Sequence, residues 1–322
     1  MLAVAGAAEA AQLRADGIER APLLVMGALS EQELRIALTA RAEVVAWRER
    51  DVRALAAAGG GRVHVKLDTG MGRLGTRDVG QARRVVELAE AVDGVHLAGV
   101  MTHFATADDR GDDGYFDAQL ARFGAWVAEL KQRRPELIAH AANSAASLRD
   151  PRSHFDLVRC GVAIYGMDPF GADPARVGLT PALRLSSYVA EVKRCAAGES
   201  VGYGRRFVAE TEQSIAVLPI GYGDGWRRAL SAGCDVLIAG ERWPLAGMVS
   251  MDNLTVSLAA AAARSIEPDA LLGREAVLIG RDGAEQITAE EVADRLDTIN
   301  YEVTCGLSAR VPRIHLRAEA QR

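Results

Sequence analysis

The chain has 322 residues, of which 49% are hydrophobic and 25% charged, a composition typical of a globular protein with two domains or one large α/β barrel and an appendage. Its formal net charge of −5 argues against a general affinity for nucleic acid or for anionic membranes. The sequence has no apolar run of about 18 residues, no secretory signal and no metal-like cysteine spacing, so we expect a reduced, cytoplasmic protein without a metal site or a membrane span.

The first half of the sequence alternates short apolar runs with amphipathic stretches of helical period. The apolar runs predict seven strands, at residues 2–5, 23–27, 44–47, 63–68, 97–104, 138–143 and 157–165, with helices between them such as 31–40, 79–91 and 115–133. Strands separated by helices of this length are typical of parallel β/α units. A closed (β/α)8 barrel needs eight strands. We therefore expect residues 1–174 to form a TIM barrel of the α/β class that lacks its first β/α unit.

The second half of the sequence changes in character after a segment rich in proline and glycine, at residues 166–181. Alternating polar and apolar residues then predict short antiparallel strands at 185–192, 214–220, 235–239, 243–248, 254–258 and 276–279. One helix is expected at 288–296, where Thr288 would cap the N-terminus and Glu291 would complete a capping box. Residues 175–322 are thus predicted to form a mainly antiparallel β domain.

Ionisable side chains lie within the fourth predicted strand, where apolar residues would be expected. Alternation places His64, Lys66 and Asp68 on one face of this strand, and a glycine-rich turn carrying Arg73 follows. In a barrel these groups would point inward, where charges are costly unless they are paired or functional. The turn would lie at the carboxyl end of the strand, where barrel active sites are found. The alternative is a solvated strand face in an antiparallel sheet.

Polar residues also occur at the ends of the next three predicted strands. His103 follows the fifth strand, Asn143 and Ser144 follow the sixth, and Arg159 lies within the seventh, close to Gly161. A serine at a helix N-terminus suits a phosphate, and a buried arginine needs an anionic or aromatic partner. A structural histidine and an ordinary helix cap are the alternatives. The placement at successive strand ends favours an active site.

Four segments with aromatic or acidic residues between small residues stand out in the predicted β domain, at 201–204, 220–226, 250–253 and 299–305. A tyrosine between glycines, such as Tyr203, is also compatible with a simple β-hairpin. Taken singly, these segments do not indicate a function; only their order along the chain is informative.

The ordered motifs resemble those of bacterial alanine racemases over essentially the whole chain. The resemblance rests on KLDTGMGRLG at 66–75, THFATAD at 102–108, ANSAAS at 142–147, IGYGDGW at 220–226, Met251-Asp252, INYE at 299–302 and RVPR at 310–313. It implies a barrel followed by a β domain, pyridoxal 5′-phosphate as cofactor, alanine as substrate, and a head-to-tail homodimer whose active sites draw on both subunits. The implied reaction interconverts L-alanine and D-alanine by two-base proton transfer and supplies D-alanine for the cell wall.

The resemblance also assigns roles to individual residues. The cofactor would be bound by Asn143, Ser144, Arg159, Gly161, Val162 and Tyr301. Arg159 would face the pyridine nitrogen, and because arginine cannot take up a further proton it would leave that nitrogen unprotonated. Ser144, the backbone of Gly161 and Val162, and the Tyr301 hydroxyl would hold the phosphate.

The same resemblance names the substrate and proton-transfer groups. Arg73, with the backbone near Met251, would bind the substrate carboxylate, Asp252 would lie beside it, and Lys66 in a carbamylated form would orient Arg73. Tyr203 of the partner subunit would be one base. Positive charge from His103 and Arg159 would lower its pKa from about 10.

The second base of the family is a lysine that also forms the Schiff base, in a Lys-x-x-x-Tyr-Gly-His motif. The sequence has no such motif and only three lysines, Lys66, Lys131 and Lys193. Together with the strand count, this predicts a chain that starts after the first β/α unit and is inactive alone. The alternatives are a serine or broad-specificity racemase of the same fold and a non-catalytic relative that binds the cofactor or regulates a partner.

Overall fold

The computed structural model describes residues 1–111, 114–231 and 233–316. The chain forms two compact units, Met1–Gly161 and Val162–Arg322, which are described separately. Within the described residues, no helix is both long and apolar enough to cross a bilayer.

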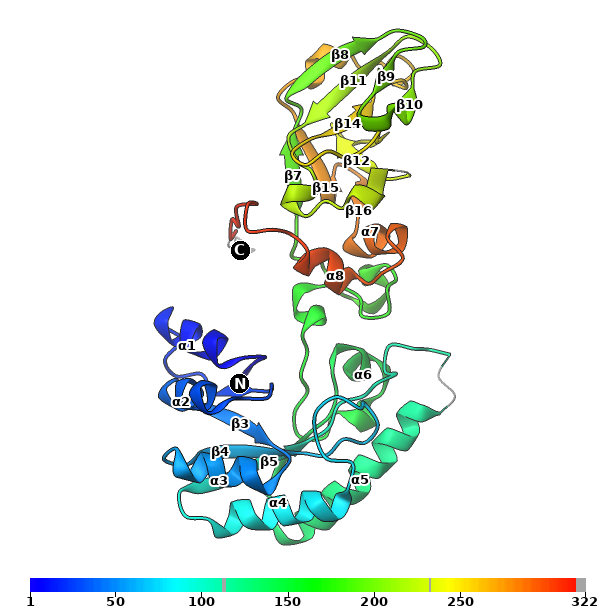
Figure 1. The fold of residues 1–322 in the computed structure, drawn as a ribbon. Helices are drawn as coiled ribbons and strands as arrows, with labels where there is room; N and C mark the ends of the chain where they lie inside the picture. The colour runs from blue at the N-terminus through cyan, green and yellow to red at the C-terminus, as the bar shows by residue number, and fades with distance from the viewer. Residues whose placement is uncertain (112–113, 232, 317–322) are drawn as a thin grey trace, which may run out of the picture. The chain divides into compact units, whose positions relative to one another are not determined.

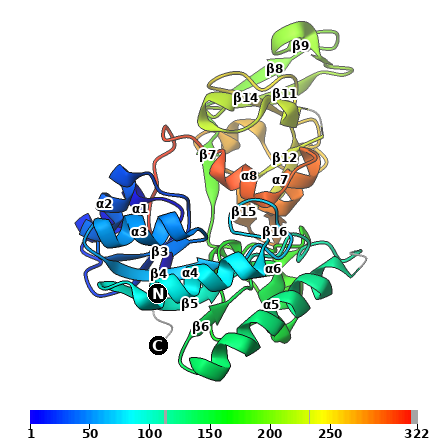
Figure 2. The same cartoon turned by 60° about the horizontal axis from the view of Figure 1, so that its bottom comes forward.

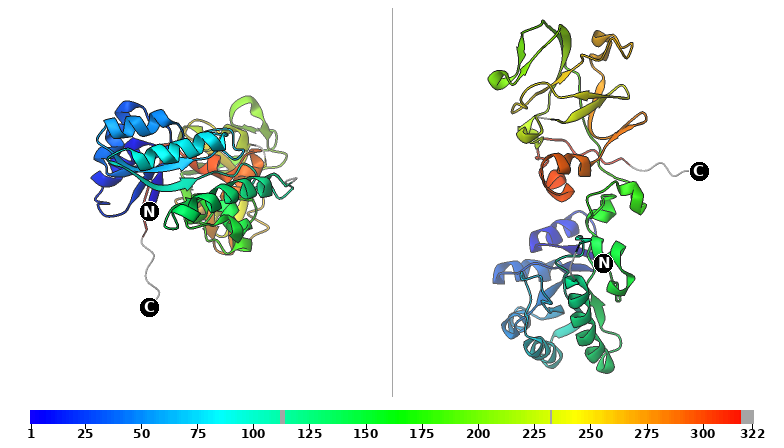
Figure 3. Two further views of the ribbon diagram at one scale, coloured as in Figure 1. Left: turned by 90° about the horizontal axis from the view of Figure 1, so that it is seen from below. Right: turned by 90° about the vertical axis from the view of Figure 1, so that its right-hand side faces the viewer.

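The first unit alternates strands and helices, as the apolar pattern predicts. Its strands are β1 (Leu2–Val4), β2 (Leu23–Val25), β3 (Ala42–Ala46), β4 (Gly61–Lys66), β5 (Val95–Met101) and β6 (Ile138–His140). Its helices are α1 (Ala7–Ala15), α2 (Glu31–Thr39), α3 (Glu49–Ala57), α4 (Val79–Ala91), α5 (Tyr115–Arg133) and α6 (Ser144–Arg149), followed by the 3-10 helix η1 (Pro151–Ser153). The six strands pair in sequence order and are all parallel. They form the curled sheet seen from several sides in Figures 1, 2 and 3.

Local sequence signals account for the helices that cover this sheet. Helix α2 begins at a capping box, in which Ser30 Oγ accepts from the backbone N–H of Glu33 and the Glu33 carboxylate accepts from the backbone N–H of Ser30. Helix α5 buries Phe116, Phe123 and Leu130, which recur every seven residues and so lie on one face.

The seventh strand expected at 157–165 is not formed, and this part of the prediction was wrong. Only Leu157 makes a bridge to β6, at His140. The backbone N–H of Arg159 still bonds to the carbonyl oxygen of Ala142, but helix α6 begins at Ser144, so a seventh strand has no partner to pair with beyond this point. The backbone N–H of Gly161 bonds to the Ser144 side chain instead, and residues Val162–Tyr165 form the 3-10 helix η2. The parallel sheet thus has six strands where seven were expected.

The second unit is mainly antiparallel, as predicted. Its strands are β7 (Leu185–Tyr188), β8 (Glu191–Cys195), β9 (Ser200–Val201), β10 (Phe207–Val208), β11 (Gln213–Leu218), β12 (Asp235–Ile238), β13 (Glu241–Pro244), β14 (Leu254–Ser257), β15 (Glu275–Asp282) and β16 (Glu285–Ile287). Its helices are α7 (Ala289–Arg295) and α8 (Asn300–Cys305), and its short 3-10 helices are η2, η3 (Pro174–Val177), η4 (Tyr203–Arg205), η5 (Tyr222–Asp224), η6 (Arg228–Ser231) and η7 (Pro268–Leu271).

The strands of the second unit form separate sheets around a buried apolar core that includes Trp226 and Trp243. One sheet has the order β14-β11-β8, and a second has the order β13-β12-β15-β16 with β7 also paired to β15. The single strand expected at 185–192 is therefore two strands, β7 and β8, in different sheets. Helices α7 and α8 pack together at one end of the sheets (Figure 2).

The N-terminus of α7 shows how far local reasoning reaches. Thr288 is its cap, because its hydroxyl accepts from the backbone N–H of Glu291. The other half of the expected capping box is absent. The Glu291 carboxylate instead accepts a hydrogen bond from the guanidinium of Arg242 on β13, which lies within reach.

Candidate active site

The polar residues at the carboxyl ends of β4, β5 and β6 converge in the first unit. His64 and Lys66 are buried on one face of β4, as alternation predicts, and the apolar residues Val63 and Val65 are buried on the other. Both faces are covered because the sheet is curled and helices lie outside it. The alternative of a solvated strand face is therefore wrong, and these ionisable groups need partners inside the unit.

Arg159 lies at the centre of this group and donates to four acceptors. Its NH1 donates to Nδ1 of His140 over 2.9 Å, and its NH2 donates to the carbonyl oxygens of Thr102 (2.8 Å) and Ala141 (2.9 Å) and to Nδ1 of His103 (3.1 Å). Within the described residues, its Nε–H has no hydrogen-bond partner. The guanidinium is thus rigidly held with one directed donor left for a ligand.

The hydrogen bonds from Arg159 continue into the interior as a chain. His140 Nε2 lies 2.9 Å from His64 Nδ1, and His64 Nε2 lies 2.7 Å from the Glu43 carboxylate, which also accepts from Arg62 at 2.8 Å. Because arginine can only donate, Nδ1 of His140 must be an acceptor, and its proton sits on Nε2. The same reasoning puts the His64 proton on Nε2, facing Glu43. Every bond therefore points from Arg159 towards the carboxylate.

A glycine on β5 makes room for the contact between the two histidines. A Cβ at Gly99 would lie 2.6 Å from His64 Nδ1 and 2.6 Å from the carbonyl oxygen of Ile138. Real Cβ atoms do not approach so closely, so any side chain here would displace His64 or β6. Gly99 is required by the interior network rather than by a turn.

Burial and neighbouring cations keep His140 and His103 neutral. Burial lowers the pKa of His140 to about 2 and that of His103 to about 3, and the Arg159 charge contributes to both. His103 therefore does not supply the positive charge that the sequence analysis expected of it. Burial also lowers the pKa of Lys66 to about 8, with further lowering by the charges of Arg159 and Arg73. A lysine with this pKa is partly a neutral amine near pH 8.

Arg73 lies on the glycine-rich turn after β4 and is exposed. Its guanidinium has no hydrogen-bond or ion-pair partner within residues 1–111, 114–231 and 233–316. It lines a hollow of about 400 Å³ together with residues that follow β2 and β3, such as Leu29 and Trp47. An unpaired arginine at the mouth of such a hollow can bind a carboxylate.

Asp68 shapes this turn rather than facing a ligand. Its carboxylate accepts from the backbone N–H groups of Gly70 (3.0 Å) and Gly72 (3.1 Å) and from Arg77 (3.2 Å). These donors hold the pKa of Asp68 below its usual range against the opposing effect of burial, which would raise it. The acidic residue singled out beside His64 and Lys66 thus fixes the turn that presents Arg73.

Asn143 and Ser144 lie at the start of α6, and they have different roles. Asn143 is the N-cap, since its Oδ1 accepts from the backbone N–H of Ala146 at 2.9 Å. The Ser144 hydroxyl accepts from the backbone N–H of Gly161 at 2.9 Å. The capping prediction is confirmed for Asn143, and two residues expected at a phosphate, Ser144 and Gly161, are in contact.

The remaining predicted site residues lie on the second unit, and most of them are exposed. Tyr203 is 72% exposed and Met251 53% exposed, while Tyr301 is 39% exposed on α8. The Asp252 carboxylate accepts from Arg310 at 2.6 Å. Tyr203 follows Gly202, which has a φ of +76° and whose Cβ position would lie 3.1 Å from the backbone nitrogen of Met248, so a side chain at this position would be strained. Its aromatic ring is therefore presented on a strictly defined turn.

Comparison of the chain with known proteins identifies its family. The model of the N-terminal domain of alanine racemase matches residues 1–169, and that of the C-terminal domain matches residues 182–315. The alanine racemase of Symbiobacterium thermophilum is 42% identical over 98% of this chain and 82% of its own length. The chain belongs to the alanine racemase family.

Solved structures of alanine racemases agree with this conclusion. The crystal structure from E. faecalis matches with a TM-score of 0.85 and 37% identity over 97% of this chain and 82% of its own. The structure from Bacillus anthracis with bound L-Ala-P matches with a TM-score of 0.84 and 36% identity over 98% of this chain and 81% of its own. The fold expected from the motifs, an incomplete β/α barrel followed by an antiparallel β domain, is that of the alanine racemases, and in this structure the barrel part is a curled sheet of six parallel strands.

The residues of the first unit fit pyridoxal phosphate, the cofactor of this family. A pyridine nitrogen is a hydrogen-bond acceptor, and the Nε–H of Arg159 is a held donor with no partner among the described residues. A phosphate needs several donors, and the Ser144 hydroxyl lies at the backbone N–H of Gly161 at the start of α6. A substrate carboxylate needs a cation, which the unpaired Arg73 supplies.

Two residues of the alanine racemase interior, Glu43 and His140, were not predicted from the sequence as site residues. Both are polar residues within apolar strands, the signal that singled out His64. They were overlooked because neither is followed by a glycine-rich turn or an active-site motif. Their importance comes from strand pairing and from the contact of His64 and His140 across β5, which join residues far apart in sequence.

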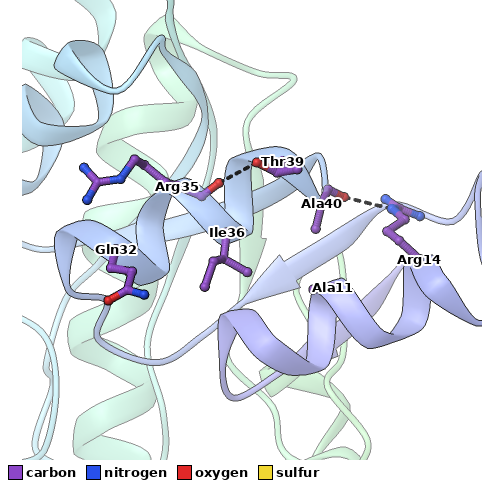
Figure 4. A pocket seen from close by; sticks show the side chains of 7 residues that line it. All are labelled: Ala11, Arg14, Gln32, Arg35, Ile36, Thr39 and Ala40. Atoms are coloured by element: carbon purple, nitrogen blue, oxygen red, sulfur yellow. Dashed lines mark hydrogen bonds between the residues drawn. The ribbon is translucent and has the colours of Figure 1, made fainter.

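A second hollow in the first unit, of about 430 Å³, lies between α1 and α2 (Figure 4). Its polar groups bond within the protein: Arg14 donates to the carbonyl oxygen of Ala40 at 2.8 Å, and the Thr39 hydroxyl donates to that of Arg35 at 2.9 Å. None of the residues that the alanine racemase motifs single out lines it. We assign it no role in the reaction.

Proposed function

We propose that the chain binds pyridoxal 5′-phosphate and acts in the racemisation of alanine. The observation that supports this most directly is Arg159, whose guanidinium is held by four acceptors from two segments, residues 102–103 and 140–141, while its Nε–H has no hydrogen-bond partner among the described residues. Pyridoxal phosphate, when bound, withdraws electrons from the α-carbon of an amino acid joined to it, so that the α-proton becomes acidic. The protein must then bind the two molecules and move that proton.

In this proposal Arg159 donates to the ring nitrogen and leaves it unprotonated. Burial lowers the pKa of Arg159 to about 10, so the guanidinium stays charged at neutral pH and has no proton to give up. A ring nitrogen without a proton attracts electrons less strongly. This arrangement favours simple proton return over side reactions of the activated α-carbon.

The proposal assigns the phosphate to Asn143, Ser144 and the backbone of Gly161 and Val162, with the Tyr301 hydroxyl. Ser144 is supported by its contact with Gly161, and Asn143 acts through the helix start that it caps. A phosphate accepts several hydrogen bonds at once, so its affinity depends on donors from these segments together.

The substrate carboxylate is assigned to Arg73, with Met251 and Asp252 beside it. Lys66 is proposed to react with carbon dioxide. Its lowered pKa of about 8 leaves a reactive neutral amine, and a carbamate would replace a cation by an anion between Arg159 and Arg73. The negative charge of a carbamate on Lys66 would attract the Arg73 guanidinium, where the ammonium repels it, and so would hold Arg73 in a fixed position.

Tyr203 is proposed as one of the two bases, acting in the site of a second copy of the chain in a homodimer. Its high exposure and its rigid glycine-flanked turn suit a side chain that works outside its own unit. Tyrosine needs positive charge to be deprotonated near neutral pH. Arg159, rather than the neutral His103, is the cation that would supply it.

The binding of reduced adducts tests this function without relying on turnover. Phosphopyridoxyl-L-alanine and phosphopyridoxyl-D-alanine join cofactor and substrate in one stable molecule, and their dissociation constants can be measured by calorimetry. A racemase must accept both hands, so we expect affinities within about fivefold of each other and a loss of at least about tenfold for both in Arg159→Ala. A strong preference for one hand, or no effect of Arg159→Ala, contradicts the proposal. Tighter binding of the serine adducts would instead favour a serine or broad-specificity racemase.

A further inference from the structure

A cluster of three buried polar residues in the second unit has no role among the ligand and base assignments made above. Asp168 is 1% exposed, Glu290 4% and Asn300 2%. They come from three segments: the loop after η2, the first turn of α7, and the first residue of α8. The cluster therefore ties together parts of the chain that are up to 132 residues apart in sequence.

The contacts within this cluster are reciprocal. Glu290 Oε1 accepts from the backbone N–H of Asp168 at 2.9 Å and from Nδ2 of Asn300 at 2.8 Å. The same Nδ2 donates to the backbone carbonyl oxygen of Asp168 at 2.8 Å. The Asp168 carboxylate in turn accepts from the backbone N–H groups of Phe170 and Ala172. Both backbone groups of Asp168 and the loop that follows are thus fixed to α7 and α8.

The other oxygen of Glu290 makes this cluster unusual. Oε2 is buried and has no hydrogen-bond partner within the described part of the chain. An unsatisfied buried carboxyl oxygen is unfavourable for folding, and apolar side chains of similar volume often stabilise a protein as well or better. The partial positive charge at the start of α7 offsets only part of this cost. Stability alone does not explain a carboxylate at this position, whereas a need for defined geometry does.

The geometry that the cluster fixes involves two proposed phosphate ligands. Asn300 directly precedes Tyr301, and Asp168 closes the loop that follows η2, whose first residue is Val162. We propose that Glu290 is a positioning residue that holds the Tyr301 hydroxyl and the Val162 backbone at the spacing that a phosphate requires. This inference rests on the proposed function of Tyr301 and Val162.

The test compares two ligands that differ only in the phosphate. Pyridoxamine phosphate and pyridoxamine form no Schiff base with lysine, and the ratio of their dissociation constants measures the contribution of the phosphate. A variant that is merely less stable weakens both ligands equally and leaves the ratio unchanged. We expect Glu290→Leu to reduce the preference for the phosphorylated ligand by about tenfold, the effect of losing one well-placed hydrogen bond to a charged group.

Two further variants separate positioning from a general effect on α7. Glu290→Gln keeps an acceptor at the Oε1 position and should retain the preference within about twofold. Glu291→Leu removes the neighbouring carboxylate, which bonds to Arg242 rather than to α8, and should leave the preference unchanged. Should Glu290→Leu fail to fold, Asn300→Ala removes both Nδ2 bonds and is expected to give the same loss.

Tyr301→Phe distinguishes failure of this inference from failure of the proposed function. If Tyr301→Phe reduces the preference for phosphate and Glu290→Leu does not, the positioning role of Glu290 is wrong. If Tyr301→Phe has no effect, the proposed phosphate role of Tyr301 is wrong, and the inference falls with it. If both variants reduce the preference, a double variant no worse than Tyr301→Phe alone shows that Glu290 acts through Tyr301, and a worse double variant shows that it also acts through the Val162 backbone.

Discussion

Arg159 donates from NH1 to Nδ1 of His140 over 2.9 Å, and this one contact determines where the protons of two histidines lie. His140 must donate from Nε2 to His64, and His64 must donate to Glu43. The cation that the alanine racemase resemblance places at the cofactor ring is therefore connected to a carboxylate deep in the sheet. The position of the guanidinium depends on residues that touch no ligand.

Gly99→Ala should disturb this chain of hydrogen bonds. The new methyl group would lie 2.6 Å from both His64 Nδ1 and the Ile138 carbonyl oxygen, so His64 or β6 must shift. We expect a loss of about 1–3 kcal/mol in the free energy of unfolding, measured by urea denaturation. Gly124→Ala on α5 is the matched control, because nothing lies within 4 Å of its Cβ position. It should be neutral or stabilising by up to about 1 kcal/mol.

Acid should destabilise the protein through His140. Its pKa is about 2 in the folded chain and about 6.5 when unfolded, so the unfolded chain binds more protons between these values. The free energy of unfolding therefore falls as the pH drops below about 6.5. Between pH 7.5 and 5.5 this residue should account for about 1.4 kcal/mol of the loss.

Urea denaturation of His140→Gln at the two pH values measures this contribution. The variant should be less stable than the parent chain at both pH values. The fall in its free energy of unfolding from pH 7.5 to pH 5.5 should be smaller than in the parent chain by about 1.4 kcal/mol. His96→Gln replaces an exposed histidine on β5 and should leave the difference unchanged. An unaltered pH dependence in His140→Gln would show that this histidine is not buried in its neutral form.

Lys66 should take up carbon dioxide more readily than the other lysines. With a pKa of about 8, about half of it is neutral at pH 8, compared with well under 1% of a lysine with the ordinary value. Carbon-13 NMR with labelled bicarbonate should show one carbamate signal. The signal should vanish in Lys66→Ala and persist in Lys193→Ala. A signal that survives in Lys66→Ala assigns the carbamate to another amine.

Arg73 should matter only for ligands that carry a carboxylate. We expect Arg73→Ala to weaken phosphopyridoxyl-alanine by about 10- to 100-fold, as for the loss of a charged hydrogen-bonded pair. It should leave phosphopyridoxyl-ethylamine, which has no carboxylate, within about twofold. Arg50→Ala removes an exposed arginine from the same hollow and should affect neither ligand. Equal weakening of both ligands by Arg73→Ala would show a structural role.

Much of this site could be predicted from the sequence, because its parts are local. Alternation along β4 correctly buries His64 and Lys66, and the capping pattern correctly places Asn143 at the start of α6. The segment around Arg159 was wrongly predicted as a strand. Its apolar residues have the right pattern, but the start of α6 removes the strand with which they would pair.

The interior network could not be predicted in the same way. Glu43, His64, His140 and Arg159 come from different segments of the chain, and strand pairing together with the contact of His64 and His140 across β5 brings them together. The same holds for the effect of burial on His103, which is neutral where a cation was expected. Sequence patterns give the face of a residue and its neighbours in the chain, but not its partners across the sheet.

The most direct test of this account is the nitrogen-15 NMR shift of the ring nitrogen in bound pyridoxamine phosphate at pH 7. If the Nε–H of Arg159 meets that nitrogen, the shift will be that of an unprotonated pyridine which accepts a hydrogen bond. A shift typical of a protonated pyridinium would contradict the account, because an arginine held as this one is has no acceptor for that proton.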